Sequence, residues 1–107
     1  MYYQQGDVLI ISGAEVPKAA KPSARLRDGK AVLAEGEATG HAHVAEGPGV
    51  ELYELRDRLV LKAPNGATVT HEEHLPIVIE PGDYTIRQVR VYDHFAPQED
   101  RIRAPLD

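Results

Sequence analysis

The 107-residue chain contains no cysteine. This absence excludes disulfides, thiolate metal sites and a cysteine nucleophile, so any metal ion would need histidine or carboxylate ligands. Long apolar runs are also missing, because the longest one near the start is the run VLII at 8–11. A membrane-spanning helix needs about 20 apolar residues. We therefore expect a cytoplasmic protein that has no membrane partner.

Positive charge is scarce as well. The chain has 12 lysines and arginines against 17 aspartates and glutamates, which gives a net charge of −5 at pH 7. Binding along a nucleic-acid backbone needs clustered lysine and arginine side chains that neutralise phosphates. The composition therefore predicts no long nucleic-acid partner, whereas a small anionic ligand in a local basic pocket is compatible with it.

Helical periodicity is absent from every long segment, and short apolar or alternating runs recur instead. Turn residues separate these runs at regular intervals, and the clearest turn is Asn-Gly at 65–66. The pattern predicts one all-β domain over residues 1–107, a small barrel or sandwich of about eight short strands. Residues 50–56 and 58–63 are typical of a hairpin, and 84–93 is the longest alternating run.

Two segments lack a strand pattern. Residues 94–107 are expected to form a C-terminal tail, and residues 13–30 are expected to form a basic mobile loop. Long loops in compact domains are often functional or disordered, so the loop is interpreted either as a solvated segment or as a flap that contacts an anion. Its local excess of three positive charges comes from five basic residues against Glu15 and Asp28, namely Lys18, Lys21, Arg25, Arg27 and Lys30.

Four of the five histidines lie in two short motifs, GEATGHAH at 36–43 and HEEH at 71–74. Residues two apart share one face of a strand, so Thr39, His41 and His43 are expected to point the same way. His71 and His74 share a face only on a bulge or turn. The run ATVTH continues a regular strand that could lie beside HAHV, which slightly favours His71 over His74 as the partner of the first pair, although the sequence does not determine whether the two motifs meet.

One interpretation gives the histidines no chemistry, as polar residues at strand ends. A second is a site for a divalent transition metal with His41, His43, His71 and His74 as ligands, because imidazole suits such ions. The HAH motif resembles the His-x-His element of cupins, all-β barrels that bind a metal with three histidines and one glutamate. Gly36 matches the glycine before that pair. In cupins a Pro-Gly turn precedes a later histidine of the site. In this chain the Pro-Gly pair at 81–82 instead follows His74, so the order departs from the cupin pattern.

A third interpretation is catalysis without a cofactor. Histidine titrates near neutral pH, so one imidazole can take the proton of an RNA 2′-hydroxyl while another protonates the leaving 5′-oxygen. The product is a 2′,3′-cyclic phosphate. Thr39 could donate to a phosphate oxygen. The repeated His-x-Thr or His-x-Ser motif of two-histidine phosphodiesterases is absent, which excludes that superfamily. Positive charge near the developing oxyanion would stabilise it, and the candidates are Lys62, Arg87, Arg25 and Arg27.

Together, GEATGHAH, HEEHLPI and PGDYTIRQVR resemble a family of small single-domain bacterial and phage proteins, over roughly Gly6 to Tyr92. Some of these are similar to CRISPR-associated ring nucleases, which degrade cyclic oligoadenylate in antiviral defence. The resemblance implies a homodimer that cleaves a small cyclic RNA without metal. Tyr84, Tyr92 and Phe95 are candidates for stacking on adenines or for core packing.

The sequence thus predicts a metal-independent phosphodiesterase, a ring nuclease whose catalytic residues are His41, His43, His71 and His74. The first alternative is a cupin-like metal-binding protein, enzymatic or not. The second is an interaction domain without chemistry.

Overall fold

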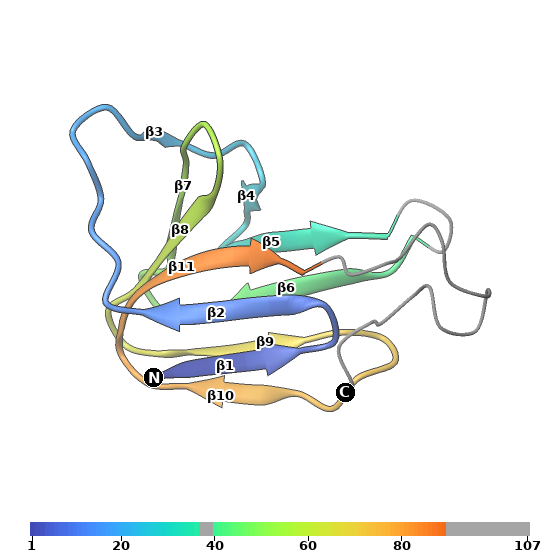
Figure 1. Ribbon diagram of the computed structural model, residues 1–107. Coiled ribbons are helices and arrows are strands. Elements are labelled where there is room, and N and C mark those ends of the chain that lie inside the picture. The colour runs from blue at the N-terminus through green and yellow to red at the C-terminus, as the bar shows by residue number, and fades with distance from the viewer. Residues whose placement is uncertain (37–39, 90–107) are drawn as a thin grey trace.

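Eleven short strands form two antiparallel sheets in the computed structural model, which describes residues 1–36 and 40–89 (Figure 1). The larger sheet has the order β1-β2-β11-β8-β7-β3, with β1 Tyr2–Gln5, β2 Val8–Ser12, β11 Gly82–Gln88, β8 Leu59–Ala63, β7 Glu51–Glu54 and β3 Lys21–Pro22. The smaller sheet has the order β10-β9-β6-β5-β4, with β10 Ile77–Ile79, β9 Ala67–Thr70, β6 Ala42–Glu46, β5 Lys30–Glu35 and β4 Leu26–Arg27.

The two sheets pack as a sandwich, and the all-β prediction is confirmed. Apolar residues alternate along the strands and meet between the layers, which is the pattern that sheet pleating imposes. Each fully buried leucine, isoleucine or valine contributes roughly 1.5–3 kcal/mol relative to an exposed one. The largest fully buried side chains are Tyr84, Ile10, Leu52, Leu61, Ile79, Val8, Val60 and Val69.

Tyr84 belongs to this core rather than to a binding surface. Its side chain is 2% exposed, its ring packs edge-on against Tyr3 at a centroid distance of 6.0 Å, and its hydroxyl donates to Glu80 O. The interpretation of Tyr84 as a base-stacking residue is therefore wrong. The alternating run at 84–93 places it on the inner face of β11, where the second sheet covers it. Tyr92 and Phe95 lie outside the described residues.

The predicted hairpin and turn are both present. β7 pairs with β8 in the register Tyr53↔Val60, and the Asn-Gly turn links β8 to β9. Gly66 adopts φ +79° there, and a Cβ at this position would lie 2.8 Å from Ile79 O. Only glycine meets both the positive φ and the close backbone approach.

The strand count is eleven rather than about eight, because three strands have no apolar signal of their own. β1 has the polar sequence YYQQ and is held by its register with β2, for example Gln5↔Val8. β3 and β4 lie inside the segment 13–30, which was expected to be a loop throughout, and each has only two residues. They form because β7 and β5 offer sheet edges, as in the pair Leu26↔Ala31.

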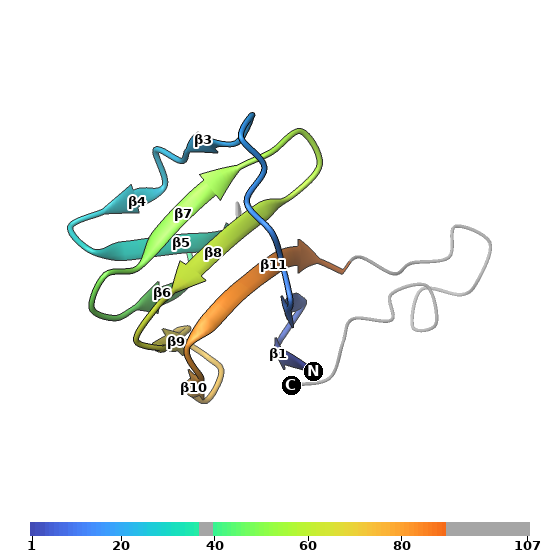
Figure 2. The ribbon, with the colours of Figure 1, turned by 90° about the vertical axis from the view of Figure 1, so that its left-hand side faces the viewer.

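The stretch 13–20 runs along the outer face of the larger sheet before it reaches β3 (Figure 2). The amides of Gly13 and Ala14 both donate to Asp83 O, at 3.1 and 3.2 Å, which fixes the start of this stretch to β11. Val60 in β8 is fully buried although it lies outside the main core cluster. Within the described part of the chain there is no helix that could cross a membrane.

One end of the sandwich collects the features that concern function. The β1–β2 turn, the start of β6, the end of β9 and the end of β11 all lie at the right-hand end in Figure 1. The antiparallel pairings require this, because β11 ends where β2 begins, in the pair Gln88↔Val8. The histidines of both motifs reach this end from the smaller sheet.

Candidate functional site

The four histidines of the two motifs come together between the sheets. β6 and β9 are antiparallel neighbours in the register Val44↔Thr70, so HAHV lies beside ATVTH, an arrangement that the sequence had left open. His43 points inward from β6 and is 5% exposed, and His71 follows the last residue of β9. His74 lies three residues further on in the β9–β10 loop, and His41 lies just before β6. The pairing thus joins two motifs that are separated by almost thirty residues of sequence.

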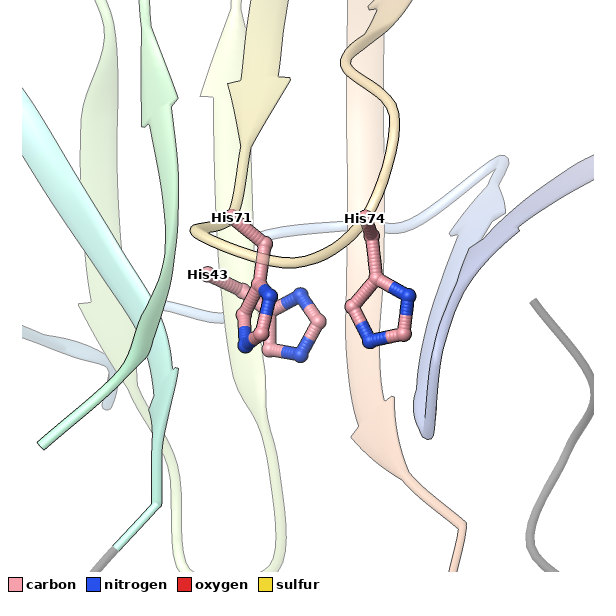
Figure 3. A group of neighbouring side chains, drawn as sticks. All are labelled: His43, His71 and His74. Atoms are coloured by element: carbon pink, nitrogen blue, oxygen red, sulfur yellow. The ribbon is translucent and has the colours of Figure 1, made fainter. Parts of the chain in front are cut away.

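The imidazole rings pack against one another (Figure 3). His71 lies 4.2 Å from His43 and 4.5 Å from His74 between ring centroids, and the rings of His43 and His74 are stacked at 5.6 Å. One ring nitrogen from each of these three residues lies within 4.8 Å of the others. Ligands about 2.1 Å from one tetrahedral zinc ion are roughly 3.4 Å apart. Small side-chain rotations would therefore bring these nitrogens to coordinating distance.

Gln5 fixes the orientation and the tautomer of His43. Its Nε2 donates to Val69 O at 3.0 Å and to Leu75 O at 2.9 Å, so its Oε1 is left facing His43 Nδ1 at 2.8 Å. An amide oxygen can only accept, so Nδ1 carries the proton and the lone pair of a neutral His43 lies on Nε2. A buried histidine whose second nitrogen donates to a neighbouring oxygen is the usual arrangement of a metal ligand.

Asp7 and Gly6, in the β1–β2 turn, complete the same wall of the site. Asp7 Oδ1 lies 3.5 Å from His43 Nε2, and Asp7 Oδ2 accepts a hydrogen bond of 2.8 Å from Gln88 Nε2. Gly6 has φ +57°, and a Cβ there would lie 2.7 Å from His74 Nε2. The absence of a side chain at Gly6 therefore makes room for the His74 ring.

The pKa of His43 is lowered from the ordinary histidine value. Burial is the main cause, and the neighbouring His71 and His74 lower it further, because a second positive charge among stacked rings is unfavourable. The carboxylate of Asp7 acts in the opposite direction and raises the pKa. The net effect favours a neutral imidazole at neutral pH, which is the form that offers a lone pair to a proton or a metal ion.

The two glutamates of HEEH tie the β9–β10 loop to the start of β6. Glu72 Oε1 accepts the amide hydrogen of Ala42 at 2.9 Å, and this bond is the main cause of the lowered pKa of Glu72. Glu73 Oε1 lies 3.2 Å from His41 Nδ1. The Glu73 amide donates to His71 Nδ1 at 3.0 Å, so the lone pair of a neutral His71 lies on Nδ1. A cation bound by that nitrogen would replace the amide hydrogen.

The predicted cationic residues divide into two groups. Arg25 and Arg87 line one cavity together with Gln88, which donates to Asp7. Lys62 and Arg27 do not line it, since Lys62 pairs in register with Asp83 at the start of β11, and Arg27 pairs with Lys30 at the start of β5. Arg27 Nε donates to Ala24 O. Thr39 lies outside the described residues.

Sequence reasoning did not identify Gln5 or Asp7 as residues of the site. The signal for Gln5 was weak, since the run YYQQ shows no apolar alternation, and a polar residue is inward-facing at this position only because β1 pairs with β2. Asp7 does sit in the turn, but its carboxylate faces His43. Both residues precede His41, the first histidine of the motifs, by more than thirty positions, so only the fold brings them together.

A family model described as a domain of unknown function, DUF8820, matches residues 4–89. The chain belongs to this family. The matched range contains Gln5, Asp7 and the four clustered histidines, and it ends where the described residues end. The family description states no activity, so the similarity to ring nucleases stays a prediction. No match was found among curated proteins or among solved structures.

Proposed function

We propose that the protein binds one transition-metal ion, such as Zn²⁺, through His43, His71 and His74, and that the bound ion activates water for hydrolysis. The observation that carries the proposal is the convergence of three imidazole nitrogens within 4.8 Å at a single partly buried place. Histidine, aspartate and glutamate are the only metal ligands of useful strength in a chain without cysteine. The metal-binding alternative from the sequence is thus the one that the geometry supports best.

The surroundings of His43 support this assignment. Gln5 holds Nδ1 and leaves Nε2 directed towards Asp7, and burial keeps the ring neutral, so the ligand nitrogen needs no deprotonation at neutral pH. Catalytic zinc sites commonly use three protein ligands and keep one position for water. Asp7 supplies the carboxylate next to His43 Nε2, where it would be placed to accept a proton from water if an ion occupied the site.

The test is a metal titration of the full chain after dialysis against EDTA. Addition of Co²⁺ is expected to give the visible absorption of a tetrahedral site, saturating at a single ion per chain, and Zn²⁺ is expected to displace it. His43→Ala should weaken binding by more than about 100-fold, because second-shell changes alone cost 10–100-fold.

His94→Ala is the matched control, because His94 lies outside the matched range 4–89. This variant is expected to titrate like the wild-type chain. Wild-type protein that shows no saturable Co²⁺ spectrum, or a spectrum that persists unchanged in the His43→Ala variant, would rule out the metal centre.

A second candidate function is the metal-free phosphodiesterase, acting on cyclic oligoadenylate. The observation that favours it is the pair His41–Glu73, in which a carboxylate 3.2 Å from the imidazole can stabilise a protonated ring. His43, neutral with its lone pair on Nε2, would take the proton of the 2′-hydroxyl. The oxygen would attack the adjacent phosphorus, and His41 would give its proton to the leaving 5′-oxygen. The product is a 2′,3′-cyclic phosphate.

The two candidates differ in their response to EDTA. Cleavage of cyclic tetra-adenylate that survives EDTA and is lost in His41→Ala would establish the acid–base mechanism. Cleavage that EDTA abolishes and Zn²⁺ restores would support the metal-dependent hydrolase. If the wild-type chain cleaves no cyclic oligoadenylate under either condition, the ring-nuclease activity is excluded.

A further inference from the structure

An arginine-lined cavity of about 570 Å³ opens beside the end of β11. Its walls come from the turn between β7 and β8, from the last residues of β11 and from β5 with the segment before β4. A volume between 300 and 1,000 Å³ is typical of sites for small organic ligands. The cavity is therefore large enough for a ligand of nucleotide size.

The charge of the cavity is opposite to that of the whole chain. Four arginines line it against only two acidic residues, Glu54 and Asp57. Arg58 is engaged with Asp57 at 3.0 Å. Within the described residues the remaining three arginines form no ion pair, and they are Arg25, Arg56 and Arg87. In a protein of net charge −5, this concentration of guanidinium groups marks a place where an anion is favoured.

The floor of the cavity is apolar. Its accessible part comes from the half-buried Leu55 and Leu59, whereas Val8, Leu33 and Ile86 belong to the core beneath and are at most 4% exposed. Guanidinium groups bind phosphate oxygens with two parallel hydrogen bonds, whereas an aliphatic wall accepts a planar ring. The lining thus combines a phosphate-binding rim with an apolar floor, which is the combination that a nucleotide requires.

We propose that this cavity binds a nucleotide phosphate at Arg25, Arg56 and Arg87 and receives its base against the aliphatic floor. The cavity adjoins the histidine site, because Gln88 lines it and donates to Asp7, whose other oxygen faces His43. The inference rests on the proposed function only in that the bound phosphate ester would be the substrate of the histidine site. Nucleotide binding itself requires neither a metal ion nor a histidine.

Calorimetric titration of the full chain with AMP, in buffer that contains EDTA, tests the proposal. AMP is expected to bind in a saturable manner, inorganic phosphate more weakly, and adenosine not at all. Arg25→Gln and Arg56→Gln are each expected to weaken AMP binding roughly tenfold or more, since a hydrogen bond to a charged group is lost. Both arginines are exposed, so the fold should be retained, and an unchanged Tm for each variant would confirm this.

Arg27→Gln is the matched control, because it removes the same charge from an exposed position two residues from Arg25 that does not line the cavity. AMP affinity that stays at the wild-type value in Arg27→Gln but falls in the two cavity variants supports the site. Absence of AMP binding at millimolar concentration, or equal losses in all three variants, overturns it. Because EDTA is present throughout, failure of the metal centre leaves this result unaffected, and the two proposals fail independently.

Discussion

At the scale of single residues, the site depends on a glutamine whose side-chain amide makes three hydrogen bonds. Gln5 is 3% exposed; its Nε2 donates to two backbone carbonyl oxygens, and its Oε1 accepts from His43 Nδ1. A buried polar network of this kind rigidifies its members when every group is satisfied, and becomes costly when one member is removed. Gln5 therefore positions His43 through the backbone of β9 and of the loop that carries His74.

Gln5→Ala is expected to lower the free energy of unfolding by about 2–3 kcal/mol, because it leaves buried acceptors and the His43 N–H without partners. It should also weaken Co²⁺ binding by about 10–100-fold through misorientation of His43. Urea denaturation and the cobalt titration measure the two effects.

Gln4→Ala is the comparison for that experiment, because Gln4 is the exposed neighbour in the same strand. Its side-chain amide donates one hydrogen bond, to Gly6 O, among the described residues. Gln4→Ala should change stability by less than half as much. Equal losses in both variants would show that Gln5 has no special structural role.

At the scale of elements, the sequence predicted what alternation and turn chemistry control. The β7–β8 hairpin and the Asn-Gly turn follow from local patterns. The pairing of β6 with β9 does not, because it joins distant segments, and the sequence left open whether the two histidine motifs meet. The strands β1, β3 and β4 do not follow from local patterns either, since their pairing is determined by the neighbouring sheet edge. The histidines of the candidate site were predicted, whereas Gln5 and the role of Asp7 were not: these two reach the site only through the β1–β2 turn.

Substitution of Gly6 in the β1–β2 turn tests how this turn supports the packed histidines. Gly6→Ala is expected to destabilise the protein by about 1–2 kcal/mol through the left-handed backbone and by a further 1–3 kcal/mol or so through contact with His74. Gly13→Ala is the matched control, because Gly13 has φ +88° but open space around its Cβ position.

Thermal unfolding of the two glycine variants separates the contributions of backbone and ring. Gly13→Ala should lose only the stability that the left-handed backbone conformation costs. Gly6→Ala should lose more stability and should also alter the metal titration. If the two variants lose the same stability, the close packing of His74 on Gly6 is refuted.

At the scale of the whole molecule, charge is distributed unevenly, and composition alone could not reveal it. Although the net charge is −5, one cavity is lined by four arginines. They come from three separated segments, at residue 25, residues 56–58 and residue 87. The sequence suggested Arg25 and Arg87 as ligand-binding residues, but their association with Arg56 and Arg58 depends on how the sheets stack. Long-range packing of this kind has no local sequence signal.

Global stability is expected to decrease at acidic pH. Because the pKa of His43 is lowered in the folded state, the unfolded chain binds a proton more readily at this position. At pH 8 His43 is neutral in both states, so this destabilising effect is absent. The free energy of unfolding falls as the pH drops through about 6.5, the pKa of histidine in the unfolded chain. It levels off below the pKa of His43 in the folded state.

Denaturant unfolding in EDTA between pH 8 and pH 5 measures this dependence. His43→Asn keeps a donor for Gln5 Oε1 and removes the titrating group, so it should flatten part of the pH dependence. A pH profile that is the same in this variant as in the wild-type chain would exclude His43 as its source.

The position of β2 between β1 and β11 has a consequence for the order in which the protein folds. β2 precedes β11 by some seventy residues of sequence, and β11, the last strand among the described residues, is its second neighbour, in the pairs Tyr84↔Ser12 and Gln88↔Val8. Sheets that depend on such distant contacts fold slowly, since a long loop must close first. On the ribosome, β1 and β2 are made before β11, so the larger sheet cannot close and Gln88 cannot reach Asp7 until β11 has emerged. The histidine site is therefore expected to assemble after translation of the strands rather than during it.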